Sequence, residues 1–274
     1  MLSAAGAEVI TRRCGRDPTF GGQSPEPSPE NLQGLARAVA DHDADLGIAN
    51  DGDADRLALV TPRRGVLDEN LLFAATYEYL LGDDTGPAVR TVSTTFLIDR
   101  IAAAHGENVV ETPVGFKWIA QAMAEHDALI GGEESGGFSV RGHVREKDGV
   151  LMALLAGAAE VEESYDDRLD RVLAEHGRIV ADKTNVACPD DLKEPTIAAL
   201  EVVIPETVAG RPVESVVTVD GFKLLLADGS WILVRPSGTE PKMRVYAESD
   251  SEDVVAELLD AGRELAEPLV EQAQ

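Results

Sequence analysis

Three aspartates alternate in the stretch Asp51-Gly52-Asp53-Ala54-Asp55, between two apolar segments. Carboxylates this close repel one another unless a cation lies between them, and such hard oxygen ligands suit Mg²⁺ or Ca²⁺. An EF-hand is excluded, because its sixth position would be Arg56 and its twelfth Pro62. The spacing therefore predicts a metal site with coordination positions left open for a phosphate, and a solvated acidic turn is the alternative.

A second stretch is rich in donors for an anion. Residues 235–244 read Arg-Pro-Ser-Gly-Thr-Glu-Pro-Lys-Met-Arg, between two expected strands. Small residues in a turn expose backbone N–H groups that form an anion-binding nest. Ser237 and Thr239 add hydroxyl donors, and Arg235 adds a bidentate fork. This density favours phosphate binding at Arg235, Ser237, Gly238, Thr239 and Arg244 over an ordinary glycine turn.

Glu133 and Ser135 lie among the glycines of residues 131–137. A carboxylate with a hydroxyl can bind the vicinal hydroxyls of a sugar, although a flexible acidic turn explains this pattern equally well. Positive side chains lie near this stretch in the sequence, and they can either serve a phosphate or pair with neighbouring carboxylates. They are Lys117, Arg141, His143, Arg145 and Lys147.

The apolar periodicity predicts elements that would position these loops. Strands are expected at 7–10, 46–49 and 57–61, the last two on either side of the aspartates. Helices and strands then alternate from 68 to 130, which indicates an α/β layer with partly parallel strands. From 213 to 247, short strands separated by Asp220-Gly221 and Asp228-Gly229 predict antiparallel hairpins, followed by a helix over 251–269. The fold class is thus multi-domain α/β with a C-terminal α+β domain, divided as 1–64, 65–177 and 178–274.

Composition excludes some partners. The net charge of −26 over 274 residues, without a basic stripe, argues against nucleic acid and anionic membranes. Because the acidic residues are dispersed, they predict a halophilic, salt-adapted surface. No apolar run approaches the roughly 20 residues of a membrane span, and residues 1–10 do not read as a signal peptide. With two distant cysteines, the sequence predicts a cytoplasmic protein.

The three loops together resemble those of the α-D-phosphohexomutases, the phosphoglucomutase and phosphomannomutase family. Asp51 to Arg56 is similar to the family's metal loop, Gly132 to Gly137 to its sugar-binding loop, and Arg235 to Pro241 to its phosphate-binding loop. They occur in the family's order, and the resemblance covers essentially the whole chain. It implies an isomerase that interconverts hexose 1-phosphate and 6-phosphate through Mg²⁺ and a phosphoserine.

The resemblance also implies roles for single residues. Asp51, Asp53 and Asp55 would hold Mg²⁺, and Glu133 and Ser135 would bind sugar hydroxyls. Lys147 would lie near the transferring phosphate and Arg56 beside the phosphoserine, and Lys117 and His143 would also belong to the active site. The phosphate that does not react would be bound by Arg235, Ser237, Gly238, Thr239 and Arg244. The forms Glu-Glu-Ser-Gly-Gly and Thr-Pro-Val-Gly-Phe-Lys favour glucose over mannose or glucosamine as the hexose.

One part of the family pattern is missing from this sequence. The catalytic serine of the family lies in a Ser-His-Asn loop of its first domain, and the chain resembles only the end of the second domain, the third and the fourth. We therefore expect this chain alone to lack mutase activity, with the N-terminal part supplied by another chain or by a longer gene. A non-catalytic subunit that binds sugar phosphate is the first alternative. A Mg²⁺-dependent phosphohydrolase that uses Asp51 as its nucleophile is the second.

Overall fold

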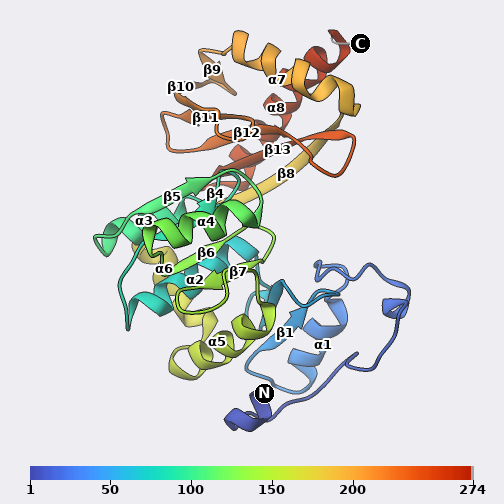
Figure 1. The fold of residues 1–274 in the computed structure, drawn as a ribbon, viewed down its shortest axis with the longest axis vertical. Helices are drawn as coiled ribbons and strands as arrows, with labels where there is room; N and C mark the ends of the chain where they lie inside the picture. Colours follow the sequence, from blue (N-terminus) through green and yellow to red (C-terminus); the bar gives the residue numbers. More distant parts are fainter. Residues whose placement is uncertain (273–274) are drawn as a thin grey trace. The chain divides into compact units, whose positions relative to one another are not determined.

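The computed structural model describes residues 1–272 and divides into two compact units. Unit 1 comprises residues 1–111 and 115–176, and unit 2 comprises residues 112–114 and those from 177 onward (Figure 1). The expected order of elements is largely confirmed, with α/β layers followed by an antiparallel α+β domain.

Unit 1 begins with a small antiparallel sheet in the order β1-β2-β3. Strand β1 (Gly47–Asn50) and strand β2 (Leu57–Thr61) form a hairpin closed by the pair Asn50 and Leu57. The acidic stretch is therefore the turn of this hairpin. All five residues of β2 are buried, so the turn is anchored in the core on its C-terminal side. Helix α1 (Gln33–Asp41) packs against the hairpin, and β3 (Gly65–Val66) adds a short edge.

The strand predicted at residues 7–10 is wrong. These residues are exposed and form no ladder with another part of the described chain, although a short 3₁₀ helix (Leu2–Ala5) precedes them. A strand is stable only when its N–H and C=O groups find a partner strand. Apolar residue types alone did not supply that partner.

The second sheet of unit 1 has the order β5-β4-β6-β7. Strands β4 (Ala88–Thr91) and β6 (Ile130–Gly132) are parallel, whereas β6 and β7 (Phe138–Val140) are antiparallel. Residues 133–137 form the turn between β6 and β7. The other elements of this layer are β5 (Val109–Thr112), α2 (Glu69–Leu81), α3 (Leu97–Ala104), α4 (Phe116–His126), α5 (Gly149–Glu162) and α6 (Tyr165–His176).

Local sequence explains where these helices begin. The Asp68 carboxylate accepts hydrogen bonds from the amides of Asn70 and Leu71, which caps α2. Asp148 caps α5 in the same way, through the amides of Val150 and Leu151. The apolar face of α4 covers the sheet through Phe116, Ile119, Ala122 and Met123, which pack with Val89.

Unit 2 is built on a six-stranded antiparallel sheet in the order β8-β13-β12-β11-β10-β9. Both α7 (Lys193–Val202) and α8 (Glu252–Gln272) bury apolar side chains against one face of this sheet (Figure 1). The two expected hairpin turns are present, with positive φ at Gly221 and Gly229. The strands are β8 (Val180–Ala187), β9 (Thr207–Val208), β10 (Arg211–Val217), β11 (Phe222–Leu226), β12 (Trp231–Pro236) and β13 (Lys242–Ser249).

Among the elements of unit 2 that sequence patterns missed, β8 and α7 are the longest. Strand β8 reads Val-Ala-Asp-Lys-Thr-Asn-Val-Ala, with polar residues in its middle, but pairs with β13 along its whole length. It is an edge strand with mostly exposed side chains, which removes the usual apolar alternation. Helix α7 carries Pro195 in its first turn, where the missing N–H has no intrahelical partner to lose.

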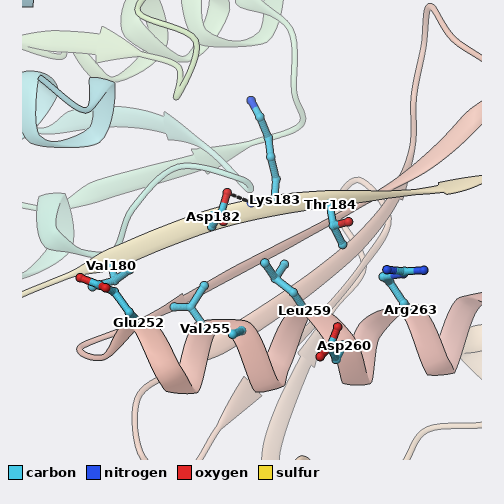
Figure 2. A pocket seen from close by; sticks show the side chains of 10 residues that line it. Val180, Asp182, Lys183, Thr184, Glu252, Val255, Leu259, Asp260 and Arg263 are labelled. Carbon is cyan, nitrogen blue, oxygen red and sulfur yellow. Dashed lines mark hydrogen bonds between the residues drawn. The ribbon is translucent and has the colours of Figure 1, made fainter. Parts of the chain in front are cut away.

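An open hollow of about 490 Å³ lies between β8 and α8. Figure 2 shows apolar side chains from both elements facing it, with acidic and basic side chains around them. Its lining comprises Val180, Asp182, Lys183, Thr184, Glu252, Val255, Ala256, Leu259, Asp260 and Arg263. Over residues 1–272, no helix has both the length and the apolar character needed to cross a membrane.

Candidate functional site

The β1–β2 turn brings its three aspartates together. Asp51, Asp53 and Asp55 each offer a carboxylate oxygen within 4.8 Å of the other two. Asp53 is exposed, whereas the side chain of Asp51 is only 2% exposed. The Asp51 carboxylate accepts hydrogen bonds from the Arg56 amide at 3.1 Å and from Arg56 Nε at 2.7 Å. Burial opposes ionisation of Asp51, but these bonds and the Arg56 charge outweigh it and lower the pKa of the carboxyl.

The start of α5 holds this turn in shape. The Gly149 amide donates to the Ala54 carbonyl at 3.0 Å, and the Asn50 side chain donates to the Arg56 carbonyl at 2.8 Å. A Cβ at position 149 would lie 2.5 Å from both the Arg56 carbonyl oxygen and the Asn50 side-chain nitrogen. Glycine at 149 is thus required by the close approach of the helix to the turn. Ala54 itself has a φ of 60°, a conformation that contacts from both sides must maintain.

The turn between β6 and β7 lies directly beside the aspartates. The Leu57 amide donates to the Gly136 carbonyl at 2.9 Å, and the backbones of Arg56 and Gly137 pair in an isolated antiparallel β-bridge. Lys147 connects the two turns, because its ammonium pairs with Asp55 while its aliphatic stem fills the space above Gly137. Unit 1 therefore brings the acidic turn together with the glutamate-bearing turn and Lys147, which both lie in a later part of the sequence.

Glu133 is the buried carboxylate of this cluster, with 8% of its surface exposed. It accepts a hydrogen bond from the Gly115 amide at 3.1 Å. Burial, followed by the neighbouring charge of Glu134, raises the pKa of Glu133. Ser135 is half-buried in the same turn. A carboxylate fixed in this way is suited to accept hydrogen bonds from hydroxyl groups of a ligand.

Two other predicted residues of unit 1 have different partners. The ring of His143 lies 2.8 Å from the carboxylate of Asp148, which also caps α5. Amide donation from Leu151 and then the histidine lower the pKa of Asp148. Lys117 is exposed in the first turn of α4, and its ammonium lies 4.8 Å from the centre of the Trp118 ring. Both side chains thus contact neighbours in sequence instead of the carboxylates of the acidic turn.

The phosphate loop, defined as residues 236–241, joins β12 to β13 in unit 2. Arg235 precedes it and donates through Nε and a terminal nitrogen to Asp220, at 3.2 and 3.0 Å. The Ser237 amide donates to the Lys242 carbonyl, which closes the loop, and Ser237 is buried. Gly238 and Thr239 are exposed at its tip.

Glu240 gathers two cations at the edge of this loop. Its carboxylate accepts from Lys242 Nζ at 2.8 Å and from an Arg244 guanidinium nitrogen at 2.9 Å. These two donors lower the pKa of Glu240. Arg235 and Arg244, both predicted to bind phosphate, therefore pair with carboxylates of the protein, as Arg56 and Lys147 do in unit 1.

The sequence interpretation overlooked three residues that shape these loops. Gly115 supplies the amide that binds Glu133, Gly149 packs α5 against the acidic turn, and Lys193 binds two carbonyls of the phosphate loop. Gly115 lies in the Thr-Pro-Val-Gly-Phe-Lys stretch, but nothing in that stretch indicates its contact with Glu133, and Lys193 stands out only as a lysine in a strongly acidic chain. The large hollow between β8 and α8 shares no residue with the predicted loops, and its lining mixes both signs of charge.

Sequence comparisons support the assignment made from the loops. Profiles of the phosphoglucomutase/phosphomannomutase family match along the chain: alpha/beta/alpha domain II at residues 1–65, alpha/beta/alpha domain III at 68–178 and the C-terminal domain at 184–265. The chain belongs to the phosphoglucomutase/phosphomannomutase family. Within this family, it resembles the "Probable phosphoglucosamine mutase" of Methanopyrus kandleri, with 35% identity over 100% of this chain and 59% of that protein.

Two further relatives agree with this membership. The "Phosphoglucomutase/phosphomannomutase" of Thermococcus kodakarensis is 32% identical over 97% of this chain and 57% of its own length. A crystal structure of a "putative phosphomannomutase" from Thermus thermophilus superposes with a TM-score of 0.78 at 31% identity, covering 96% of this chain and 56% of that one. The chain thus spans somewhat more than half the length of the curated phosphohexomutases that it matches.

Proposed function

We propose that this chain carries the metal, sugar and phosphate loops of a phosphohexomutase, an isomerase that interconverts hexose 1-phosphate and hexose 6-phosphate. The observation that carries the proposal is the cluster in unit 1, where Asp55, Lys147 and the Glu133 turn adjoin one another. Membership of the family supports the reaction class. We also propose that residues 1–64, 65–177 and 178–274 correspond to three successive domains of that enzyme.

The carboxylates of the acidic turn fit a magnesium ion. Asp51, Asp53 and Asp55 supply oxygen atoms close enough to share one cation, and hard oxygen donors are the ligands that Mg²⁺ prefers. When bound, the ion would neutralise charge on a phosphoryl group. The close contacts of Arg56 with Asp51 and of Lys147 with Asp55 keep this acidic cluster compact without a metal.

The chain's own residues supply the rest of the proposed site. Phosphoryl transfer depends mainly on positioning and charge neutralisation, so cations beside the metal loop are the expected machinery. Lys147 and Arg56 would exchange their carboxylate partners for phosphate oxygens, and Lys117 and His143 would contribute further positive charge. Glu133 and Ser135 would orient the sugar through its hydroxyls. Arg235, Ser237, Gly238, Thr239 and Arg244 would bind the phosphate that does not react.

The buried state of Asp51 argues against a phosphohydrolase that uses it as a nucleophile. Its side chain is 2% exposed, and its oxygens already accept two hydrogen bonds from Arg56. A nucleophile must reach the phosphorus atom with a free lone pair.

We propose glucose phosphate as the hexose phosphate, because the sequences Glu-Glu-Ser-Gly-Gly at Glu133 and Thr-Pro-Val-Gly-Phe-Lys at Lys117 resemble those of glucose-phosphate mutases. The naming of the Methanopyrus kandleri relative favours glucosamine phosphate as a second candidate. The binding affinities of glucose 1-phosphate, mannose 1-phosphate and glucosamine 1-phosphate, measured by calorimetry with Mg²⁺ present, separate these candidates. Glucose 1-phosphate is expected to bind most tightly, and tighter binding of the amino sugar would transfer the assignment to glucosamine.

We further propose that the 274-residue chain binds sugar phosphate without isomerising it. Its sequence holds no Ser-His-Asn loop to carry the phosphoserine of the family. The test is an assay of the chain with glucose 1-phosphate, glucose 1,6-bisphosphate and Mg²⁺, beside a binding titration of the same preparation. Binding without glucose 6-phosphate formation supports the proposal, whereas turnover by the chain alone would contradict it.

A further inference from the structure

The phosphate loop is held from its inner side by one ammonium group. Lys193 Nζ donates to the Ser237 carbonyl at 2.6 Å and to the Glu240 carbonyl at 2.8 Å. It also pairs with Asp190 at 2.5 Å. The side chain is only 12% exposed, and it reaches the loop from the first turn of α7. All three donors of this ammonium therefore have partners, two of them on the loop backbone.

The backbone amides at the tip of the same loop, in contrast, have no hydrogen-bond partner in the protein. Within residues 1–272, the N–H groups of Gly238, Thr239 and Glu240 donate to no protein group. These three residues are exposed, in contrast to the buried Ser237 just before them. The loop thus has two carbonyls bound to a cation and three successive exposed amides without a protein partner, which are donors available to an anion.

We propose that Lys193 is a positioning residue for phosphate binding, an inference that rests on the proposed function of the loop. By engaging the two carbonyls, the ammonium removes their lone pairs from the surroundings of the anion. It fixes the Ser237–Gly238 peptide plane, which carries the Gly238 amide, and it holds the other end of the loop through the carbonyl of Glu240. Because the Asp190 carboxylate offsets its charge, the ammonium acts on the anion mainly through this loop geometry.

The geometry explains why the residue is lysine. An ammonium directs three donors to the corners of a tetrahedron, which suits two carbonyls and the Asp190 carboxylate at once. A guanidinium presents a planar fork that matches a single carboxylate or phosphate better. Arginine at 193 would therefore keep the charge but lose the simultaneous contacts with Ser237 and Glu240.

The test compares four forms of the full chain by ³¹P NMR titration with inorganic phosphate and with glucose 6-phosphate. Lys193→Met is expected to weaken both affinities about tenfold, which corresponds to about 1.4 kcal/mol. Lys193→Arg is expected to weaken them about threefold, because the charge remains but the loop geometry changes. Lys183→Met is the matched control, since Lys183 is exposed on β8 and its loss changes the net charge equally. This control should bind as the wild type does.

A second readout separates positioning from simple charge. In the wild type, phosphate should slow hydrogen exchange at the amides of residues 238–240, and in Lys193→Met this protection should be lost. The inference is overturned if Lys193→Met binds within twofold of the wild type, or if Lys193→Arg matches the wild type while Lys193→Met does not. If Lys193→Met fails to fold, the affinity of Lys193→Arg tests the inference, and binding equal to that of the wild type overturns it. A wild type that binds neither ligand rejects both the phosphate loop and this role, whereas binding unaffected at Lys193 rejects this role alone.

Discussion

The two candidate ligand regions are built on different principles. In unit 1, side chains from separate segments neutralise one another, with Arg56 on Asp51 and Lys147 on Asp55. In unit 2, Arg235 and Arg244 also pair with carboxylates, but a short loop adds backbone amides, and one lysine binds its carbonyls. Side chains that neutralise each other must exchange partners when a ligand arrives, but backbone amides are already in position. The first region should therefore depend on the packing of several segments, and the second on the contacts that hold a single loop.

Glycine substitutions give the largest expected contrast. A Cβ at Gly149 would lie 2.5 Å from the Arg56 carbonyl and 2.8 Å from the Ala54 carbonyl, whereas a Cβ at Gly238 would meet no atom within 4 Å. Gly149→Ala should lower the free energy of unfolding by about 2 kcal/mol, because the backbone must shift. Gly238→Ala should change it by less than about 0.5 kcal/mol. Urea unfolding followed by circular dichroism measures both, and equal effects would refute the contrast.

Substitutions of Asp51 and Asp53 should affect Mg²⁺ binding alike but the free energy of unfolding differently. Asp51 is buried with two hydrogen bonds from Arg56, but Asp53 is exposed. Asp51→Asn should lower unfolding free energy by roughly 1–2 kcal/mol, since it weakens charge-assisted bonds, whereas Asp53→Asn should leave it nearly unchanged. Both should weaken Mg²⁺ binding by about tenfold or more in calorimetry. Undiminished Mg²⁺ affinity in Asp53→Asn would remove that residue from the metal site.

In unit 2, Glu240 competes with an incoming anion for Lys242 and Arg244. Glu240→Gln should therefore tighten inorganic phosphate binding, by about threefold on the scale of one surface charge interaction. Calorimetry at fixed ionic strength measures the change, with Glu194→Gln on α7 as a control for the loss of one negative charge. Weaker binding in Glu240→Gln would mean that the carboxylate supports the loop instead of competing for its cations.

The smallest expected effect concerns pH. Burial raises the pKa of Glu133 above its ordinary 4.5, so its ionised form costs stability in the folded state. Glu133→Gln should stabilise the protein at high pH, where the carboxyl of the folded chain is ionised, and this gain should disappear as the pH falls below 4.5, where both folded and unfolded chains are protonated. Melting temperatures across this range test the sign. A gain that does not vary with pH would show that ionisation of Glu133 is not its cause.

The sequence predicted the loops better than their surroundings. A short apolar run located β2, and turn signals located the hairpin turns at Asp220-Gly221 and Asp228-Gly229, because these features are local. The contacts of Gly149 with residues 50–56 and of Lys193 with residues 237 and 240 join distant segments, so no local pattern could specify them. The edge strand β8 was missed for a related reason, since its pairing with β13 is visible only in the folded chain. The roles predicted for the site residues stay predictions.

A ³¹P NMR titration of the chain with glucose 6-phosphate in the presence of Mg²⁺ tests the central claim most directly. We predict a saturable shift of the phosphorus resonance that is strongly reduced in Arg235→Met and unchanged in Lys183→Met, because the ligand's phosphate should bind beside Arg235, whereas Lys183 is an exposed residue of the edge strand β8. No saturable shift in the wild type, or an equal shift in Arg235→Met, would contradict the account.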